Sequence, residues 1–473
     1  MTTESRVARA AAGDAETTGV HDEGDDMAVR TEVAVATTGA RPPRRGPLIV
    51  ALLALFVIGA SVFTATAVGG SAATAKNPAA KVEYLSITQN TVWAELLASI
   101  SKSYAKIAPG SSYKNTKIPQ EQLNQKIQLL ASQNALPLLY NTPAVDAVAQ
   151  MQKAGQVLDI GKEFRKLGVS KELVPAASVI LRKIYGPKLA ALPFEFNIEG
   201  VWYNKKIFAD NGIAVPKTYD QLVAAASKLD AKGIQPFAAS GIQGWPLTRL
   251  IGNLIFGQLG VDAMVKVKNG KAKLTDAPYV AAAQKVADLG AKGYFGKGVA
   301  SLDYGPAEDL FLQGKAAMFY MGSWILGELN DPAKNKIGLA DVGFFPFPQV
   351  VGGKGPAKLI PMNAGQPTSI NPKQLTHGNE LWLKYVAKHY GDVAMKQKGQ
   401  VTGFKVHNVP RNLSSATKLV VTQLASAKNP VLWFEALFSA KATTVSQQNA
   451  APLVTGQKSA KDFMATVQQA ISG

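Results

Sequence analysis

The sequence predicts an α/β fold in which helices alternate with the strands of mainly parallel sheets. The segment KVEYLSIT at residues 81–88 alternates apolar and polar side chains as a strand does. Residues 91–107 then repeat apolar side chains at the spacing of an amphipathic helix, and residues 119–130 do so again. The short apolar run LPLLY at 136–140 follows. Strand, helix and strand in this order indicate a parallel sheet with helical connections.

The alternation continues further along the chain. Thr218 and Gln221 predict a capping box at the start of a helix that ends at Gly233, and IQPFAAS at 234–240 is the strand expected next. Further strands are expected at 315–321 and 341–348, and further helices from Asp276, at 306–313, at 379–390 and at the C-terminus. We therefore expect the same architecture to occupy most of the chain.

The N-terminal region differs from the rest in composition. Residues 1–46 are polar and charged and have no apolar periodicity, so we expect a disordered tail. Residues 47–75 are uncharged and largely apolar, and only Gly46 separates them from Arg44 and Arg45. Positive charge on this side of an apolar segment keeps the N-terminus in the cytoplasm.

Two interpretations of this apolar segment stay open. A signal peptide would be cleaved after small residues, and ATA occurs at both 65–67 and 73–75. An uncleaved membrane anchor needs about 20 apolar residues, and 48–68 is just long enough. Met27, if it is the true start, would shorten the leader. Under either interpretation the rest of the chain is expected to be extracytoplasmic, either secreted or anchored to the outer face of the cytoplasmic membrane.

Composition excludes several classes of function. The chain has 473 residues and no cysteine, so disulfides, thiolate catalysis and cysteine-bound metals are excluded. The formal net charge is +18; the first 46 residues carry six basic and eight acidic side chains, which leaves +20 on the remainder. The lysines are scattered without a tract or an arginine-rich motif, so we expect a solvated basic surface and no nucleic-acid partner.

Motifs for catalysis or cofactor binding are also missing. The four histidines form no H-E-x-x-H spacing, and the sequence contains no G-x-S-x-G elbow and no phosphate-cradling glycine-rich loop. The sequence therefore predicts no cofactor, no metal site and no catalytic residue.

Three segments carry a resemblance to a known family. They are GVWYNKKIFADNGIAVPKTYDQLVAAASKL at 200–229, FLQGKAAMFYMGSW at 311–324 and DVGFFPFP at 341–348. In this order and spacing they resemble the extracellular solute-binding proteins of ABC importers, in family 1, the sugar-binding branch that includes maltose-binding proteins. The resemblance covers about residues 80–470. Pro137-Leu138-Leu139 stands where the family usually has Pro-Asp-Val.

The resemblance implies a two-lobed periplasmic-binding-protein-like fold of type II, with a ligand cleft between two α/β lobes. Lobe one would comprise 80–193 and 358–410, and lobe two 197–352 and 411–473. The implied function is an extracytoplasmic receptor, monomeric and without enzymatic activity. It would capture a mono- or oligosaccharide and deliver it to the membrane subunits of an ABC permease.

Candidate ligand contacts follow from strand ends. In open α/β sheets, ligands bind beyond the carboxyl ends of strands. The residues there are amides, hydroxyls, carboxylates and aromatic rings, which are the groups that bind the hydroxyls and C–H faces of sugars. Together with residues at the expected crossovers between the lobes, after the helical segment at 278–295 and near the C-terminal helices, the candidates are Gln89, Asn90, Trp93, Asn141, Thr142, Glu195, Asn197, Gln243, Trp245, Asp303, Tyr304, Ser323, Trp324, Met362, Asn363 and Trp433.

The six tryptophans differ in their surroundings: Trp93 shares the apolar face of a helix with Leu97 and Ile100, whereas Trp433 is near the C-terminal helices. Trp202 alternates within a strand and Trp382 lies on a helical stripe, so both are expected in the core. Trp245 lies in a Gly/Pro-rich stretch without apolar periodicity, which predicts a loop position and a ligand contact. Trp324 follows a buried strand and two small residues, and the resemblance favours a ligand contact for it.

Two other functions stay open. A basic cell-envelope protein with a structural or adhesive role would bind an anionic wall through charge alone. A carbohydrate-active enzyme would need a pair of carboxylates that no motif marks. Salt-dependent wall binding would favour the first alternative, and turnover of a bound sugar would favour the second.

Overall fold

The computed structural model describes residues 77–89, 92–426 and 431–472. All of them belong to one compact unit of the chain. The predicted N-terminal tail and the signal peptide or anchor that follows it lie outside these residues, as does the candidate Asn90. Within the described ranges, no helix is both long and apolar enough to cross a membrane.

The first sheet has four strands in the order β2-β1-β3-β9. They are β1 (Lys81–Ile87), β2 (Ser112–Ile118), β3 (Leu139–Asn141) and β9 (Thr368–Ile370). β2 and β3 run parallel to β1, whereas β9 runs antiparallel to β3. The strand predicted at 81–88 is confirmed as β1, and the mainly parallel pairing agrees with the prediction for this lobe.

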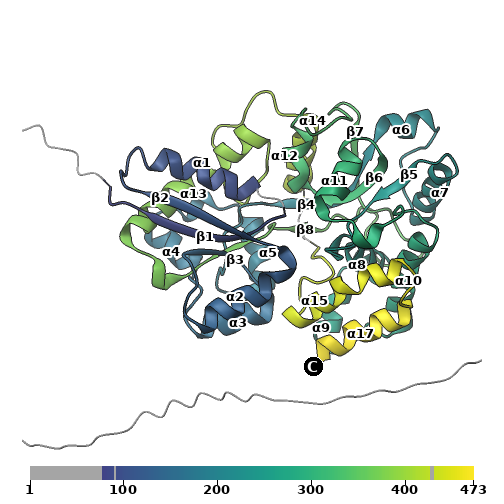
Figure 1. The fold of residues 1–473 in the computed structure, drawn as a ribbon, viewed down its shortest axis with the longest axis horizontal. Coiled ribbons are helices and arrows are strands. Elements are labelled where there is room, and N and C mark those ends of the chain that lie inside the picture. The colour runs from purple at the N-terminus through teal and green to yellow at the C-terminus, as the bar shows by residue number, and fades with distance from the viewer. Residues whose placement is uncertain (1–76, 90–91, 427–430, 473) are drawn as a thin grey trace, which may run out of the picture. The chain divides into compact units, whose positions relative to one another are not determined.

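Helices pack around the first sheet and complete the first lobe (Figure 1). They are α1 (Val92–Tyr104), α2 (Leu123–Ser132), α3 (Val145–Lys153), α4 (Ile160–Lys166), α5 (Pro175–Tyr185) and α13 (His377–Lys398). α1 and α13 pack against each other, and the indole Nε1 of Trp382 donates a 3.0 Å hydrogen bond to Ser101 Oγ. Trp382 is 1% exposed, so its predicted core position is confirmed.

The second sheet has five strands. β5, β6, β4 and β7 follow one another across it, and β8 pairs with the start of β4. The strands are β4 (Asn197–Asn204), β5 (Gln235–Ala238), β6 (Ala316–Gly322), β7 (Val342–Phe345) and β8 (Met362–Asn363). Strands were predicted at 234–240, 315–321 and 341–348, and these are confirmed as β5, β6 and β7.

Strand direction in this second sheet differs from the prediction. Only β5 and β6 are parallel, whereas β4 runs antiparallel to β6, β7 and β8. The prediction of a mainly parallel sheet is therefore wrong for the second lobe. The physical reason is that β4 enters from the first lobe, so it starts beside Gly322, where β6 ends, and runs away from the junction.

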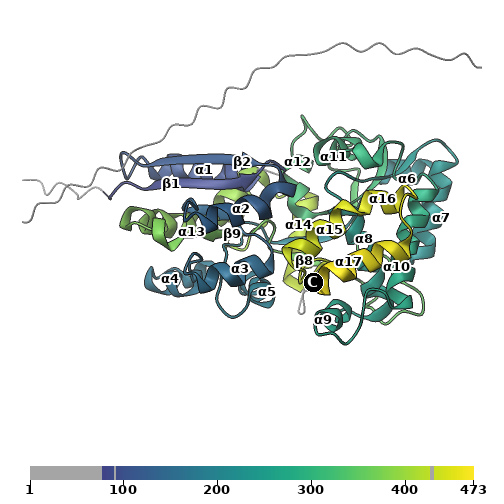
Figure 2. The same cartoon turned by 60° about the horizontal axis from the view of Figure 1, so that its bottom comes forward.

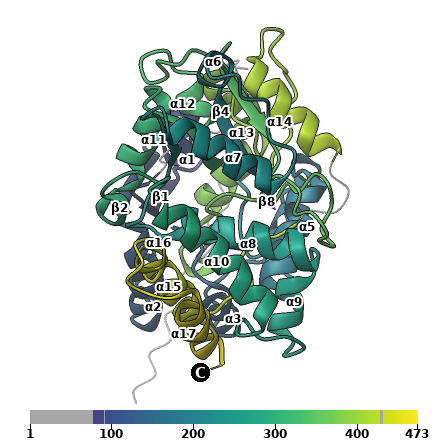
Figure 3. The same cartoon turned by 90° about the vertical axis from the view of Figure 1, so that its right-hand side faces the viewer.

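The helices of the second lobe surround a large apolar core. They are α6 (Lys205–Asp210), α7 (Tyr219–Asp230), α8 (Trp245–Leu259), α9 (Ala263–Lys268), α10 (Ala277–Ala291), α11 (Tyr304–Leu312), α12 (Leu326–Leu329), α14 (Ser415–Ser426), α15 (Ala440–Gln448), α16 (Ala450–Val454) and α17 (Ala460–Ser472). Short 3₁₀ helices lie at Gln120–Gln122, Ser170–Glu172, Val299–Ser301, Ser323–Ile325 and Pro372–Gln374. α17 packs on α10 and α15, and Figures 2 and 3 show these C-terminal helices against the second lobe.

Trp245 occupies a different position from the predicted loop. It is the first residue of α8, and Pro246 follows it at a helix position that tolerates the missing N–H. Twelve of the fifteen residues of α8 are buried, so the helix has no polar face and its sequence shows no amphipathic period. The absence of periodicity, which suggested a loop, reflects a helix buried on all sides.

Three chain segments meet at the junction between the lobes. Asn197 and Ile198 at the start of β4 pair with β8, and Pro361 forms a bridge to Val431. The core of the first lobe includes Phe194 and Ala364, whereas that of the second includes Val201 and Leu359. The chain therefore passes between the two cores just before β4 and at β8. The lobe boundaries themselves stay a prediction.

The capping box predicted at Thr218 and Gln221 is confirmed, with the Thr218 hydroxyl accepting from Gln221 N at 3.2 Å. We expect Thr218→Ala to lower the free energy of unfolding by about 1 kcal/mol, because the first turn of α7 loses this cap. Urea unfolding measures the change. Thr218→Ser keeps the hydroxyl and serves as the control; equal losses in both variants would contradict the assignment.

Candidate functional site

A cavity of about 190 Å³ lies at the junction between the lobes. Its wall includes residues that follow β1 and β3 of the first lobe, residues of α8 and α11 of the second lobe, and Asn363 of β8. It also includes Trp433 and Glu435, which follow the bridge at Val431. A volume of this order suits a small molecule rather than a macromolecule.

The first-lobe wall presents amides and hydroxyls that are held by hydrogen bonds. Gln89 Oε1 accepts from the backbone N–H of Gln120 at 3.0 Å, and Thr142 Oγ1 lies 2.9 Å from Ser369 Oγ. Behind this wall, Asn141 accepts from the backbone N–H of Ile87 and donates to the Tyr84 hydroxyl. Asn141 therefore supports the ends of β1 and β3 and does not line the cavity.

Trp93 joins this wall from the first turn of α1. It is 1% exposed, and its indole Nε1 donates a 2.7 Å hydrogen bond to the Tyr84 hydroxyl. Burial raises the pKa of Tyr84 well above its ordinary value, so this phenol stays protonated. Trp93 therefore belongs to the core and also lines the cavity. The helical pattern of the sequence could not tell these two roles apart.

The second-lobe wall is an aromatic cluster of Trp245, Tyr304 and Trp324. The Trp245 and Trp324 rings meet edge to face at 5.6 Å, and Trp245 and Tyr304 lie 6.1 Å apart. Trp324 Nε1 donates to the Tyr304 hydroxyl at 3.0 Å, and that hydroxyl donates to Glu308 at 3.1 Å. Trp245 Nε1 is buried and has no hydrogen-bond partner among the described residues.

Residues just behind the aromatic cluster hold its elements in place. Asp303 caps α11 by accepting from Tyr304 N at 2.6 Å, and it also accepts from Gln243 Nε2 at 2.5 Å. Gln243 in turn accepts from the Ser240 hydroxyl. These polar side chains satisfy one another, so they position the aromatic wall without lining the cavity.

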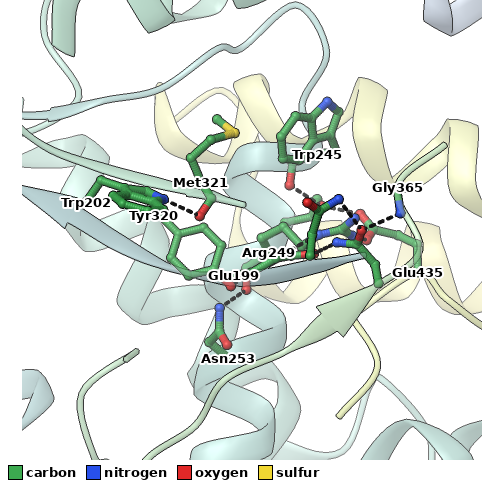
Figure 4. A network of polar contacts seen from close by, with 12 residues as sticks. Glu199, Trp202, Trp245, Arg249, Asn253, Tyr320, Met321, Gly365 and Glu435 are labelled. Carbon is green, nitrogen blue, oxygen red and sulfur yellow. Dashed lines mark hydrogen bonds and ion pairs between the residues drawn. The ribbon is translucent and has the colours of Figure 1, made fainter. Parts of the chain in front are cut away.

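The floor of the cavity is a buried polar network centred on Arg249 of α8 (Figure 4). Arg249 Nε lies 3.1 Å from Glu199 of β4, and Nη1 lies 2.6 Å from Glu435. Glu199 also accepts from Asn363 Nδ2 at 2.6 Å, and Thr248 donates to Glu435. The network thus joins both segments that pass between the lobes to a helix of the second lobe and to the segment after Val431.

The Arg249 side chain lies close to two indole rings. Its guanidinium carbon is 5.6 Å from the ring centre of Trp245 and 5.1 Å from that of Trp433. Both distances are within the range of cation–π attraction. Arg249 therefore holds two cavity tryptophans as well as two carboxylates.

Asn197 and Ser323 extend the network beyond Asn363. Asn197 Nδ2 donates to Glu195 and to Asn363, both at 3.2 Å, and Ser323 Oγ donates to Asn197 Oδ1 at 3.0 Å. Ser323 Oγ also accepts from Ile198 N at 3.2 Å. Among these residues only Glu195 and Asn363 reach the cavity.

Two carboxyl groups of the site have raised pKa values. Burial raises the pKa of Glu435, and the Arg249 charge opposes that effect. Burial, with a smaller contribution from Glu328, raises the pKa of Glu308 to about 8. Among the described residues, no group of three or more His, Asp or Glu side chains is arranged to hold a metal ion.

Nine of the sixteen candidates line the cavity: Gln89, Trp93, Thr142, Glu195, Trp245, Tyr304, Trp324, Asn363 and Trp433. Asn141, Asn197, Gln243, Asp303, Ser323 and Met362 do not line it, and Asn90 is outside the described residues. Whether the lining residues contact a ligand stays a prediction.

Several residues of the wall were missed: Gln120, Asn124, Tyr185, Arg249, Gln366, Glu435, Phe438, Thr443 and Gln447. One of them had a local signal: Arg249 lies four positions after Trp245, on the same face of a helix. Gln120 follows β2, a strand that the sequence analysis did not predict. Asn124, Tyr185, Thr443 and Gln447 lie in helices, which the strand-end criterion does not reach.

The family of bacterial extracellular solute-binding proteins matches residues 86–374, which is more than half of the chain. The chain belongs to this family. The resemblance seen in the sequence is thereby confirmed, and so are the α/β fold and the two-lobed architecture expected from it.

Curated relatives of this solute-binding protein include two described as extracellular-binding proteins of ABC transporters, from Pyrococcus horikoshii. One of them is 28% identical over a region that covers 71% of this chain and 76% of the relative. The other is 29% identical over a region that covers 43% of this chain and 46% of the relative. A multiple sugar-binding protein of Streptococcus mutans is 27% identical over 42% of this chain and 47% of its own. The matched region thus spans about half the length of two of these three relatives.

Solved structures show the same fold. A chitin oligosaccharide binding protein superposes with a TM-score of 0.74 at 25% identity, over 84% of this chain and all of that one. A structure from work on xylan utilisation by a thermophilic bacterium gives a TM-score of 0.72 at 21% identity, over 82% and 99%. At 21% identity, the similarity to this second structure supports the fold alone.

The Gly-Ser-Trp turn after β6 yields one prediction. A Cβ on Gly322 would overlap the Trp324 ring, so Gly322→Ala must displace this indole, which is 8% exposed. We expect a red-shifted tryptophan emission and a loss of stability of about 1–3 kcal/mol. Gly305→Ala is the control, since a Cβ there meets nothing within 4 Å. Unchanged emission and stability in Gly322→Ala would contradict this packing.

Glu308 yields a prediction on pH. Its folded pKa of about 8 lies above the ordinary 4.5, so the folded protein keeps a proton that the unfolded chain releases between these values. Stability should therefore fall as pH rises from 5 to 9, and Glu308→Gln should remove part of that fall. The melting temperature of each protein, measured at each pH, reports this fall in stability. The exposed Glu121→Gln is the control; an equal fall in Glu308→Gln and wild type would contradict the assignment.

Proposed function

We propose that this solute-binding protein is the extracytoplasmic receptor of an ABC importer and that it binds a carbohydrate in the cavity between its lobes. The observation that carries the proposal is the composition of the wall. Trp245, Tyr304, Trp324 and Trp433 offer aromatic faces, while Gln89, Gln120, Asn124 and Thr142 offer amides and a hydroxyl. Sugars need both, because their C–H faces stack on rings and their hydroxyls need paired donors and acceptors.

The Nε1–H of Trp245, which has no partner among the residues that the structure describes, supports the same proposal. A buried donor without a partner is costly, and a ligand oxygen would supply the missing acceptor. The names of related proteins agree, since they include sugar-binding proteins and a chitin oligosaccharide binding protein. The cargo would then pass to a membrane permease, and the receptor would act as a monomer, either free or anchored through the apolar segment at 48–68.

Capture would proceed by lobe closure. The cavity wall comes from both lobes, so a ligand gains its full set of contacts only when the lobes are together. Ligand would therefore shift the population towards the closed arrangement. Hydrolysis is not part of the proposal: it would need two carboxyl groups free to act, and Glu435 is held by Arg249 and Thr248.

A sugar panel tests the proposal. Chitin oligosaccharides, xylo-oligosaccharides, raffinose, stachyose and maltose are titrated while tryptophan emission and melting temperature are followed. A binding sugar should shift the emission and raise the melting temperature, because it stabilises only the folded state. If no saccharide changes either signal, the carbohydrate proposal fails.

Trp324→Ala tests the site. Loss of one stacking ring should weaken binding of the active sugar about tenfold or more, with the fold retained. Trp202→Phe is the matched control, because Trp202 is 1% exposed and lies outside the cavity wall. Equal affinities of Trp324→Ala and wild type, measured by calorimetry, would remove Trp324 from the site.

A further inference from the structure

A hydrogen bond joins helix α3 of the first lobe to helix α15 of the second. Asp146 Oδ1 accepts from the backbone N–H of Ala440 at 2.9 Å, across 294 positions of sequence. Asp146 belongs to the first turn of α3, and Ala440 is the first residue of α15. The bond therefore links two helix N-termini that belong to different lobes.

The carboxylate of Asp146 satisfies a donor that α15 cannot satisfy by itself. The first N–H groups of a helix have no partner within the helix. The N-cap Ser439 accepts from Ala442 N at 3.2 Å, so the cap serves the third residue of α15 and Asp146 serves the first. The helix dipole also favours a carboxylate at this end. A side chain of the first lobe thus completes the cap of a second-lobe helix while the lobes are together.

Helix α15 is part of the cavity wall. Thr443 and Gln447, about one turn apart on α15, line the cavity, and Phe438 lines it just before the helix begins. The other end of α15 lies against the start of α8, where a Cβ on Gly244 would overlap the backbone of Gln447. The position of these wall residues therefore depends on one attachment to each lobe.

The lobes meet at this place along a thin partition. A second hollow of about 290 Å³ lies beside the cavity, and Val145 and Phe438 line both. Asp146 and Ser439 line the second hollow. Because space lies on both sides of the partition, packing across it is limited. The hydrogen bond of Asp146 is the directional contact in the partition.

The lobes are also tied on the other side of the strands that cross between them. In Figure 1, α12 lies above β4 and β8, whereas α3 and α15 lie below them. Asn330, which follows α12, donates through Nδ2 to the backbone oxygen of Lys398 at the end of α13, at 2.9 Å. Loss of the Asp146 bond should therefore free one side of the junction and leave the other tied.

Resting on the proposed closure of the lobes, we propose that Asp146 is an interlobe latch, which holds α15 against the first lobe and populates the closed arrangement before a ligand binds. Both partners belong to the protein, so the bond forms without any ligand group. Asp146 does not line the cavity, so it is a positioning residue that acts through α15. A ligand would find Thr443 and Gln447 already in place, which lowers the cost of closure.

Single-molecule energy transfer in the ligand-free, full-length protein tests the latch. The chain has no cysteine, so dyes on the exposed positions Lys126→Cys of α2 and Lys461→Cys of α17 report the distance between the lobes. We expect a short-distance and a long-distance population. Asp146→Ala should lower the ratio of short to long about fivefold, because one hydrogen bond to a carboxylate is lost. A single long-distance population in the parent, or equal ratios in Asp146→Ala and the parent, overturns the inference.

Two further variants separate the latch from a general loss of stability. Asp146→Asn keeps an acceptor oxygen, so its ratio should fall less than that of Asp146→Ala; equal falls would overturn the assigned hydrogen bond. Asp159→Ala is the matched control, because Asp159 accepts from Lys162 N at 3.2 Å as the cap of α4, within the first lobe. It should lower the melting temperature and leave the ratio unchanged. A fall in the ratio equal to that of Asp146→Ala would overturn the latch. No sugar is used, so failure here leaves the carbohydrate proposal standing.

Discussion

The ion pairs of Arg249 with Glu199 and Glu435 are the interaction on which the rest of the site depends. Glu199 belongs to β4, which enters from the first lobe, and Asn363 of β8 donates to the same carboxylate. Glu435 lies beyond the bridge that joins Val431 to Pro361. A single guanidinium therefore ties the floor of the cavity to the segments that connect the lobes.

Buried ion pairs of this kind specify an arrangement more than they add stability. Taking charges out of water costs about as much as their attraction returns, whereas removing one partner leaves a buried charge uncompensated. Here the arrangement specified is that of Trp245 and Trp433, whose rings both lie within cation–π distance of the guanidinium.

Local pattern predicted much of the fold. The alternation at 81–88 and the helical stripe after it gave β1 and α1, and the resemblance gave the two lobes. β2 was missed because its residues, SYKNTKI, are polar and mostly exposed. The direction of β4 was missed because it depends on how the chain passes between lobes, which strand periodicity does not encode.

The candidate site was only partly predictable, because side-chain direction and contacts between distant parts of the chain also arise from the whole fold. Position at a strand terminus places a residue near the junction but does not fix its side-chain direction. Ser323 follows β6 and Asn197 begins β4, yet the two side chains bond to each other and do not line the wall. Arg249 lies on a helix without a polar face, and its partner Glu435 is 186 positions away in the sequence. Pairings at such separation arise only from the folded chain.

The most direct test of the account is the distance between the lobes. The chain has no cysteine, so Gln128→Cys on α2 and Lys271→Cys after α9 give two exposed, unique sites for spin labels. Pulsed electron–electron double resonance measures the distance between the two spin labels with and without a saturating concentration of an uncharged sugar. The account predicts a shorter and narrower distance distribution when the sugar is bound. A distribution that stays unchanged, while calorimetry shows the sugar bound, would contradict capture in a cleft closed by the two lobes.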